Sequence, residues 1–373
     1  MAKPTVGILS MQRVINYGSF LQAYALRELL KMHGAGEVYF VDIIPGRILV
    51  DNPVAKKNRW TRYWIRLREL KASGMLISGL KTFIFFRKVE RSIKKAWPEL
   101  KIGEHPDKPY DLVVIGSDEV FNCTQDVKWG YSRQLFGDIP YSVARKIFSY
   151  AGSFGYTDLD KLKKYKIDSE IGENLKKISA ISVRDENSAS IVESLTGISP
   201  AIHIDPVLAY GYQEEIESFT TSPYTKPYMI VYSYQDRIND KNEIDAICNY
   251  ARQNKLLLIS IFCRYDWCDK DVVPRHPIEV LRWFKYAKCV ITDTFHGTIF
   301  SIITKSNFAT LIRPSNLNKL SYMLETFALG NRETTSALME KTLSTHPDFS
   351  ECNSILDTKR HETKQYISRI LEK

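Results

Sequence analysis

Residues 290–301 constrain the fold of this chain more than any other stretch. Two apolar β-formers, Val290 and Ile291, lead into a short polar run, and apolar residues then return at helical spacing. This pattern is typical of a buried parallel strand that ends in a turn and opens a helix. It therefore predicts an α/β protein with a doubly wound parallel sheet.

The polar run between that strand and helix carries the first candidate for chemistry. Asp293 or Thr294 can cap the helix, which places His296 in the first turn, beside unpaired backbone N–H groups and the positive end of the helix dipole. A helix N-terminus at the carboxyl end of a strand is where α/β proteins receive anions. A buried histidine satisfied by a backbone carbonyl is the alternative, but the position at a strand end favours a functional role for His296.

Length and cysteine spacing bound the class of protein. With 373 residues the chain is longer than a single hydrophobic core usually supports, so two domains are expected. No apolar run reaches the length of a membrane span, and the first ten residues predict a short strand rather than a signal peptide. The six cysteines have no paired CxxC spacing, which favours reduced thiols and offers no metal cluster. We therefore expect a cytoplasmic protein without a metal.

Strands and helices alternate along the chain. Strands are predicted at residues 6–10, 38–43, 112–115, 147–150, 180–183, 229–233, 256–261, 289–292 and 308–312, and the main helices at 21–32, 162–175, 188–195, 240–253, 277–286, 320–329 and 363–371. The pattern predicts two Rossmann-like domains facing a cleft. The N-terminal α/β domain would cover residues 1–215, with a basic helical insertion at about 45–109, and the C-terminal α/β domain residues 216–350. The helix within residues 351–373 is a candidate to pack back on the first domain.

Polar residues gather after two further predicted strands. The first strand leads into a loop that contains Asn16, Gly18 and Ser19, and the third strand ends in Ser117 and Asp118. A strand, a glycine-bearing turn and a helix can cradle phosphate, although neither GxGxxG nor a Walker lysine is present. A glycine that only permits a tight turn is the alternative for Gly18.

The net charge of +9 comes from one segment. Between Lys56 and Trp97 thirteen Lys or Arg residues face two Glu residues, a local excess of +11, so the remainder of the chain sums to −2. Aromatic residues are interleaved with these cations, but no nucleic-acid-binding motif accompanies them, so nucleic acid is not expected as a partner. Trp and Tyr favour the headgroup boundary of a membrane, where each Lys or Arg contributes about 1 kcal/mol near anionic lipid. A peripheral membrane contact and a purely structural insertion both stay open.

Five motifs, in this order, resemble those of the polysaccharide pyruvyl transferase family. They are NYGS…QAYAL at residues 16–26, GSD…N at 116–122, SVRDE at 182–186, H…DPVL at 203–208 and TDTFHG at 292–297. With the flanking strands the resemblance spans residues 6 to about 312. It implies an architecture similar to that of the two-domain B-type glycosyltransferases, and an enzyme that transfers pyruvate from phosphoenolpyruvate onto a sugar as a ketal, without a cofactor.

The resemblance assigns roles to two residues at the donor. Phosphoenolpyruvate carries nearly three negative charges, which demand Arg, Lys and helix N-termini. His296 would donate a proton to the donor or bind its phosphate. Arg184 would clamp carboxylate or phosphate, because its planar fork matches either; a surface ion pair with Asp185 or Glu186 is the alternative.

The chain departs from the family at Thr294. Some relatives carry an arginine there, two residues before the motif histidine, so another cation must replace it if that arginine holds the donor. Arg313 and Lys319 follow the next predicted strand and are the candidates, with a solvated surface position as the alternative for each. Thr294 itself stays among the predicted substrate-binding residues.

The remaining candidates would handle the acceptor. Asp118 is the candidate base for an attacking sugar hydroxyl, with a structural helix cap as the alternative. Asn16, Gly18, Ser19 and Ser117 would position hydroxyls or phosphate.

These inferences predict transfer of pyruvate from phosphoenolpyruvate to a hexose of a capsular, exopolysaccharide or cell-wall precursor, with release of phosphate. The acceptor would be linked to polyprenyl diphosphate at the inner membrane face. A nucleotide-sugar glycosyltransferase on the same scaffold is the alternative, since Glu325 and Glu333 have the Glu-x7-Glu spacing of some such enzymes, without their glycine-rich turn. A non-catalytic binding protein on this fold is a third interpretation.

Overall fold

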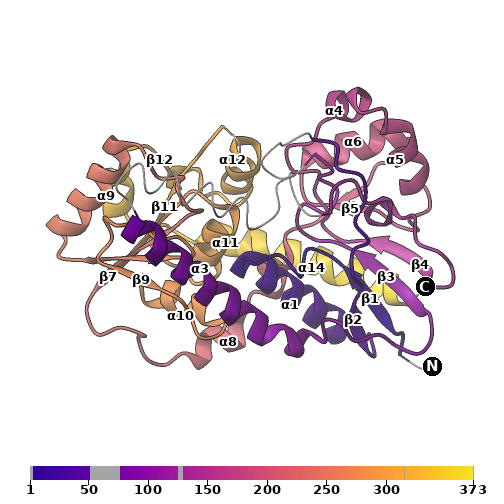
Figure 1. Ribbon diagram of the computed structural model, residues 1–373, viewed down its shortest axis with the longest axis horizontal. Coiled ribbons are helices and arrows are strands. Elements are labelled where there is room, and N and C mark those ends of the chain that lie inside the picture. The colour runs from indigo at the N-terminus through magenta and orange to yellow at the C-terminus, as the bar shows by residue number, and fades with distance from the viewer. Residues whose placement is uncertain (1–2, 51–75, 125–128, 315, 373) are drawn as a thin grey trace.

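The computed structural model describes residues 3–50, 76–124, 129–314 and 316–372. They form two α/β halves, each built on a parallel sheet flanked by helices (Figure 1). The predicted α/β class with two Rossmann-like units is therefore confirmed. The part of the basic insertion between residues 51 and 75 lies outside the described residues.

The first half is built on a parallel sheet. Its strands are β1 (Val6–Leu9), β2 (Val38–Phe40), β3 (Tyr110–Ile115) and β4 (Ala144–Ser149). They lie in the order β2-β1-β3-β4, and two short strands, β5 (Ser182–Val183) and β6 (Ala201–Ile202), continue beyond β4 through isolated bridges. Strand β1 is buried along its whole length, as expected where helices cover both faces of a parallel sheet. The direction of winding reverses between β1 and β3.

The second half has a six-stranded parallel sheet. Its strands are β7 (Tyr228–Tyr232), β8 (Leu257–Ile261), β9 (Lys270–Val272), β10 (Cys289–Thr292), β11 (Phe308–Leu311) and β12 (Glu333–Thr334). Their order, β12-β11-β10-β7-β8-β9, is that of a doubly wound dinucleotide-binding sheet. The winding reverses between β7 and β10, so β10, which precedes the TDTFHG motif, lies at the switch point.

Helices connect and cover the strands. They are α1 (Tyr17–Met32), α3 (Leu76–Ala96), α4 (Leu159–Lys164), α5 (Asp168–Leu175), α6 (Glu186–Thr196), α7 (Pro206–Tyr210), α8 (Gln213–Ser218), α9 (Lys241–Gln253), α10 (Glu279–Tyr286), α11 (Phe295–Ile303), α12 (Leu317–Thr326), α13 (Met339–Ser344) and α14 (Ser350–Glu372). The single helix predicted at 162–175 is instead α4 and α5, because Lys166 between them adopts a left-handed φ of 54°. The boundary predicted between residues 215 and 216 falls inside α8, and the domain limits stay predictions.

Helix α1 begins four residues before its predicted start. The Asn16 side chain accepts a hydrogen bond of 2.8 Å from the Gly18 backbone N–H, which caps the helix and draws the end of the predicted loop into its first turn. Gly18 is therefore helical, and the interpretation of this glycine as a tight-turn residue is wrong.

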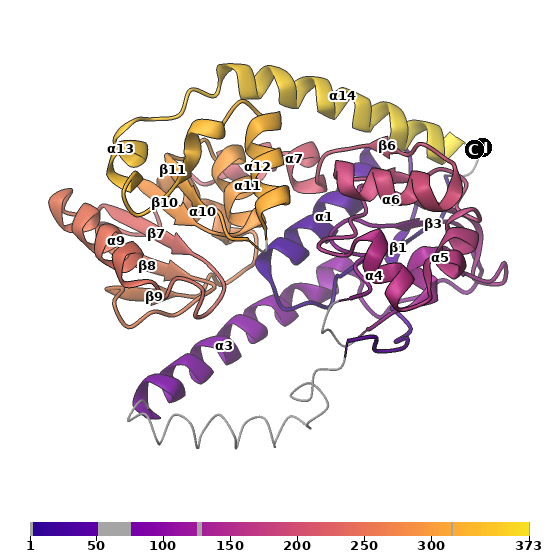
Figure 2. The same cartoon turned by 90° about the horizontal axis from the view of Figure 1, so that it is seen from above.

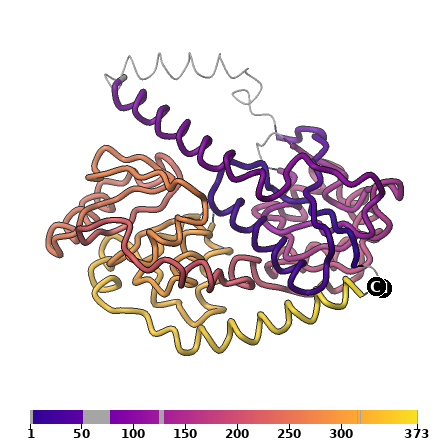
Figure 3. The backbone as a smooth tube through the Cα atoms, turned by 90° about the horizontal axis from the view of Figure 1, so that it is seen from below, coloured from indigo at the N-terminus to yellow at the C-terminus, as the bar shows by residue number. Residues whose placement is uncertain are grey.

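Two long helices run along opposite sides of the molecule and span both halves (Figures 2 and 3). In α3 a stripe formed by Phe85, Val89 and Ile93 is buried in an apolar cluster that continues through both sheets. In α14 the Tyr366 hydroxyl donates to the carbonyls of Ser149 and Ala180, at 2.7 and 3.1 Å, in the first half. Helix α3 thus packs into a cluster shared by both sheets, and α14 is hydrogen-bonded to the first half.

Candidate active site

The carboxyl ends of the central strands face each other between the two halves. The N-terminus of α1 follows β1, the N-terminus of α11 follows β10, and the two ends meet where the Gly18 backbone touches the His296 ring. A methyl group at Gly18 would lie 2.2 Å from Cγ of His296, so a glycine is required by this close approach. Crevices outside the carboxyl ends of parallel strands, at switch points, are where α/β proteins bind ligands.

Replacement of Gly18 by alanine is expected to destabilise the protein. Alanine would by itself favour the helix by about 1 kcal/mol, but pushing a methyl group into a packed imidazole costs about 1–3 kcal/mol. Denaturant unfolding would measure the difference, with Gly330→Ala as the control, because a methyl group at Gly330 meets no atom within 4 Å. A Gly18→Ala protein as stable as the control would contradict this close contact.

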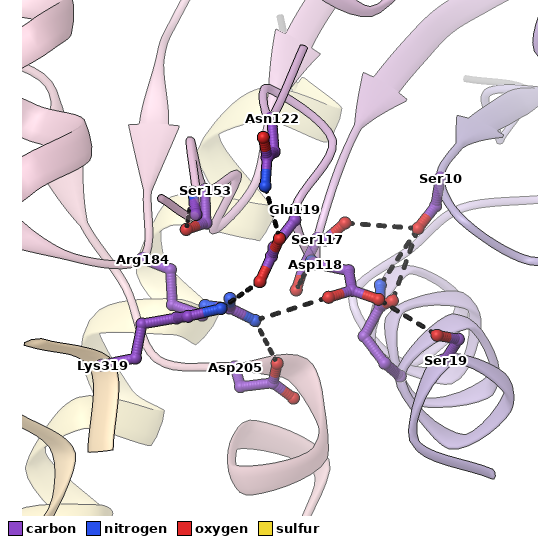
Figure 4. Close-up of polar contacts among 12 residues, drawn as sticks. Ser10, Ser19, Ser117, Asp118, Glu119, Asn122, Ser153, Arg184, Asp205 and Lys319 are labelled. Atoms are coloured by element: carbon purple, nitrogen blue, oxygen red, sulfur yellow. Dashed lines mark hydrogen bonds and ion pairs between the residues drawn. The ribbon is translucent and has the colours of Figure 1, made fainter. Parts of the chain in front are cut away.

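Arg184 lies at the centre of the site, directly after β5. Its side chain is only 6% exposed, and its Nη1 lies 3.3 Å from Oδ2 of Asp205 and 4.0 Å from Oδ1 of Asp118 (Figure 4). Its guanidinium lies 4.4 Å from the centre of the Phe295 ring, which belongs to the other half. The alternative of a surface ion pair is wrong, since Asp185 instead caps α6 by accepting a hydrogen bond from the Ser188 N–H. Burial lowers the pKa of Arg184, but Asp205 and Asp118 outweigh burial and raise it, so the guanidinium stays positively charged.

Asp118 follows β3 and faces Arg184. Its backbone has a left-handed φ of 68°, which an aspartate adopts more readily than most residues, and no helix of the described chain begins there, so the predicted alternative of a helix cap is wrong. The Ser19 hydroxyl donates a hydrogen bond of 3.1 Å to its carboxylate. Burial raises the pKa of Asp118, but His296, Arg184 and Lys319 together lower it below its ordinary value. A carboxylate with a lowered pKa is a weak base. In the free protein Asp118 therefore balances the charge of the neighbouring cations rather than accepting a proton.

His296 lies in the first turn of α11, where it was predicted. The Thr294 hydroxyl caps this helix by accepting a hydrogen bond of 2.9 Å from the Gly297 N–H. His296 is 7% exposed, and its Nε2 has no hydrogen-bond partner among the described residues, so the alternative of a fully satisfied buried histidine is wrong. A buried polar atom without a partner costs about 1–3 kcal/mol, and Nε2 of His296 is therefore available to a bound group. Burial lowers the pKa of His296 more than Asp205 and Asp118 raise it, so the ring is neutral at neutral pH.

The two candidate cations after β11 have different surroundings. Arg313 donates to both carboxylate oxygens of Glu243, at 2.6 and 2.8 Å, and to Asp293 at 3.4 Å. Its guanidinium is therefore engaged by carboxylates other than those that contact Arg184. Lys319 in α12 instead forms an ion pair with Glu119, which joins the two halves (Figure 4). Its charge acts on both Asp118 and His296. The structure therefore brings Lys319, and not Arg313, to the cluster.

The predicted positioning residues are held by internal hydrogen bonds. Asn16 donates from Nδ2 to the Tyr234 hydroxyl of the second half at 3.3 Å, and Ser117 accepts from the Asp118 N–H at 2.5 Å. Thr294 is occupied as the helix cap described above. These side chains shape the site, and their direct contact with a ligand stays a prediction.

Three members of the cluster were not predicted from the sequence. Asp205 caps α7 with one carboxylate oxygen and meets Arg184 with the other, Glu119 holds Lys319, and Phe295 supports Arg184. The Asp-Pro pair at the start of α7 signals a cap in the sequence, but the second contact of Asp205 carries no local signal.

The described residues contain no group of three or more His, Cys, Asp or Glu side chains placed to hold a metal ion. Among the helices of the described residues, none is both long and apolar enough to cross a membrane. The expectation that no metal or cofactor takes part stays a prediction.

Comparison with known proteins identifies the family. The sequence model of polysaccharide pyruvyl transferases matches residues 16–312, most of the chain. The chain belongs to the polysaccharide pyruvyl transferase family. The matched span includes Asn16, Asp118, Arg184 and His296, whereas Arg313 and Lys319 lie just beyond it. The family supports a transferase that acts in polysaccharide biosynthesis.

Several solved structures are similar to this pyruvyl transferase family member at low sequence identity. UGT89C1 of Arabidopsis thaliana, complexed with UDP-L-rhamnose, is 10% identical with a TM-score of 0.49, and the match covers 100% of both chains. MnaA of S. aureus in its UDP co-structure is 9% identical with a TM-score of 0.45, covering 98% of this chain and 91% of that one. UDP-GlcNAc 2-epimerase of Methanocaldococcus jannaschii is 10% identical with a TM-score of 0.44, covering 96% of this chain and 99% of that one. No curated protein matches the chain in sequence.

Proposed function

We propose that this protein transfers the pyruvyl group of phosphoenolpyruvate to two hydroxyls of a hexose in a capsular, exopolysaccharide or cell-wall precursor. One observation carries the proposal: Nε2 of His296, which has no hydrogen-bond partner in the described part of the chain, lies in a buried cluster with the cations Arg184 and Lys319, at the meeting point of two helix N-termini. Such a cluster suits a small donor with several negative charges.

The reaction needs a proton at one carbon and two new bonds at the next. C3 of the enolpyruvyl group takes a proton while a sugar hydroxyl attacks C2 and gives up its own proton. A second hydroxyl then closes the ring as the C2–O bond to phosphate breaks, and its proton leaves with the phosphate. The product is a cyclic ketal with a methyl group and a free carboxylate.

His296 would deliver the proton to C3 or to the departing phosphate. Its ring is neutral in the free protein, and the negative charges of the donor would raise its pKa and allow it to take up a proton. Arg184 would hold the carboxylate or phosphate through the part of its fork that faces away from Asp205. Asp118, with Ser19, would orient the attacking hydroxyl and accept its proton once the donor occupies the neighbouring cations.

Lys319 would replace the cation that relatives carry at the position of Thr294. Its partner Glu119 can be exchanged for a donor oxygen, whereas Arg313 is held by three hydrogen bonds to carboxylates. When the donor binds, Lys319 would exchange its charged hydrogen bond to Glu119 for one to a donor oxygen.

Replacement of Lys319 by methionine is expected to weaken phosphoenolpyruvate binding by about 10- to 100-fold, because a hydrogen bond to a charged group contributes about 1.5–3 kcal/mol. Titration calorimetry with phosphoenolpyruvate would measure it, and Lys341→Met, an exposed lysine of α13, is the matched control. Glu119→Gln should bind the donor at least as well as the wild type. Unchanged donor affinity in Lys319→Met would contradict this role.

The sequence feature that favoured a nucleotide-sugar glycosyltransferase lies outside the charged cluster. Glu325 and Glu333, which have the Glu-x7-Glu spacing, are both exposed, and neither contributes to the cluster around Arg184. Incubation with phosphoenolpyruvate and a lipid-linked oligosaccharide, with detection of released phosphate, tests the proposal. Acceptor-dependent phosphate release is expected, whereas transfer from a UDP-sugar without phosphate release would overturn it.

The acceptor is proposed to be linked to polyprenyl diphosphate at the cytoplasmic face of the membrane, with α3 as the docking element. Ile77, Leu80 and Ile84 on α3 are 73%, 54% and 45% exposed. Exposed basic residues accompany them along the same helix, namely Lys81, Arg87, Lys88, Arg91, Lys94 and Lys95. Apolar and basic side chains together are typical of helices that lie in a membrane interface.

Vesicle sedimentation tests this contact. The wild type is expected to bind vesicles that contain anionic lipid at low salt and to dissociate at high salt. Replacement of Lys81, Lys88, Arg91 and Lys95 by glutamine should weaken binding at least about tenfold, since each cation contributes about 1 kcal/mol. A variant with glutamine at Lys163, Lys164 and Lys166, exposed in or just after α4, is the control. Equal binding by the two variants would make α3 a structural insertion only.

A further inference from the structure

A pocket of about 190 Å³ lies beside the charged cluster, between residues 202–208 of the first half and α12 of the second. Arg184, Asp205 and Lys319 belong both to its wall and to the cluster. The pocket is thus continuous with the place proposed for the donor, yet its remaining walls have a different chemistry.

Carbon atoms make up most of the other walls. Phe295 contributes an aromatic face that is held in place by the guanidinium of Arg184. Tyr322, Met323 and Phe327 also line the pocket; Met323 and Phe327 are 4% and 2% exposed, and Tyr322 is partly buried. The remaining polar side chains of the lining belong to Asp185, His203, Thr326 and Lys359.

This lining suits a sugar ring better than a second anion. A pyranose presents a face of C–H groups, which packs against aromatic rings, and an edge of hydroxyls, which needs a few polar partners. Binding sites with apolar walls and a small number of placed polar groups have this character. Phosphate and carboxylate oxygens would instead lose their hydration against carbon walls.

The size of the pocket limits the ligand to one ring. Sites for ligands the size of drug molecules span about 300–1,000 Å³, so a pocket of about 190 Å³ admits a smaller group. A complete nucleotide-sugar exceeds it. A terminal monosaccharide fits if the rest of the acceptor extends outside.

We propose that this pocket is the acceptor subsite, which holds the monosaccharide that receives the pyruvyl group between Phe295 and Tyr322, with its reacting hydroxyls directed toward Arg184 and Lys319. The inference rests on the proposed function and specifies where its second substrate binds. It also explains why α12, whose sequence lies beyond the matched family span, is brought against the first half: the part of the site that selects the sugar comes from it.

Filling the pocket tests the assignment. Thr326→Trp places an indole in the pocket from α12, and Glu325→Trp, at the exposed neighbouring position, is the matched control. We expect Thr326→Trp to raise the acceptor KM at least about tenfold while the Kd of phosphoenolpyruvate, measured by calorimetry, stays within about twofold of the wild type. Tyr322→Ala should show the same separation, and Tyr322→Phe, which keeps the ring, should retain most acceptor affinity.

Three outcomes overturn the assignment. Weaker phosphoenolpyruvate binding with an unchanged acceptor KM would make the pocket part of the donor site, and unchanged values for both would remove it from the reaction. The third outcome comes from saturation-transfer NMR with methyl hexopyranosides. If these sugars receive no saturation from the wild-type protein, a sugar subsite is excluded. Contact in the wild type and its loss in Thr326→Trp support the subsite even if phosphoenolpyruvate proves not to be the donor, so the two proposals fail separately.

Discussion

Replacement of His296 by alanine is expected to lower acceptor-dependent phosphate release by at least about 100-fold, as when a proton-transfer group is lost. The ring lies at the N-terminus of α11, and its Nε2 has no partner among the described residues, so its removal leaves no internal hydrogen bond of Nε2 unsatisfied. Circular dichroism should therefore show a folded protein. His361→Ala, an exposed histidine on α14, is the control, and turnover near that of the wild type in a folded His296→Ala protein would refute the role.

Proton uptake gives a second measure of the same residue. Burial lowers the pKa of His296, so the ring is neutral in the free protein, and a bound anion raises the pKa and draws in a proton. Calorimetry of phosphoenolpyruvate binding in buffers of different ionisation enthalpy should show more proton uptake for the wild type than for His296→Gln. The comparison removes the contribution of the ligand's own phosphate. Equal proton uptake would mean that His296 stays neutral and acts only as a hydrogen-bonding group.

Arg184→Lys is expected to weaken phosphoenolpyruvate binding by about 10- to 100-fold, and acceptor binding less, because an ammonium group cannot reproduce the two parallel contacts of a guanidinium. Lysine is the informative substitution, since it keeps a positive charge beside the carboxylates of Asp205 and Asp118. Arg184→Met would leave both carboxylates without their buried partner and is expected to cost about 3–5 kcal/mol of stability.

Calorimetry for the donor and KM measurements for the acceptor would separate these effects for Arg184→Lys. Arg145→Lys is the control, because its side chain is 60% exposed and lies 3.7 Å from Asp111 at the surface. An unchanged Kd for phosphoenolpyruvate would leave Arg184 as a structural link between the halves. That link is visible in the stacking of Arg184 on Phe295 and needs no ligand.

Two helix boundaries differ from those predicted from the sequence. The start of α1 was misplaced because residues 16–19, which contain Asn, Gly and Ser, resemble a loop, whereas the cap formed by Asn16 draws them into the helix. The division between α4 and α5 depends on one left-handed residue, Lys166, which is not a glycine and so carries no signal in the sequence. Neither error moved a residue out of the site, because the strand ends that carry the site were placed correctly.

The amino-acid sequence by itself determined the two parallel sheets, the cap of α11 and the position of His296 in the first turn of α11. These features depend on periodicity and on hydrogen bonds between near neighbours, so a short segment contains all the information they need. Only the tertiary structure decided that Lys319 reaches the cluster while Arg313 is held by Glu243, that Asp205 is the partner of Arg184, and that α12 closes a carbon-lined pocket. Each of these joins segments far apart in the chain, and each depends on how deeply charges are buried when the two halves pack, which no local pattern specifies.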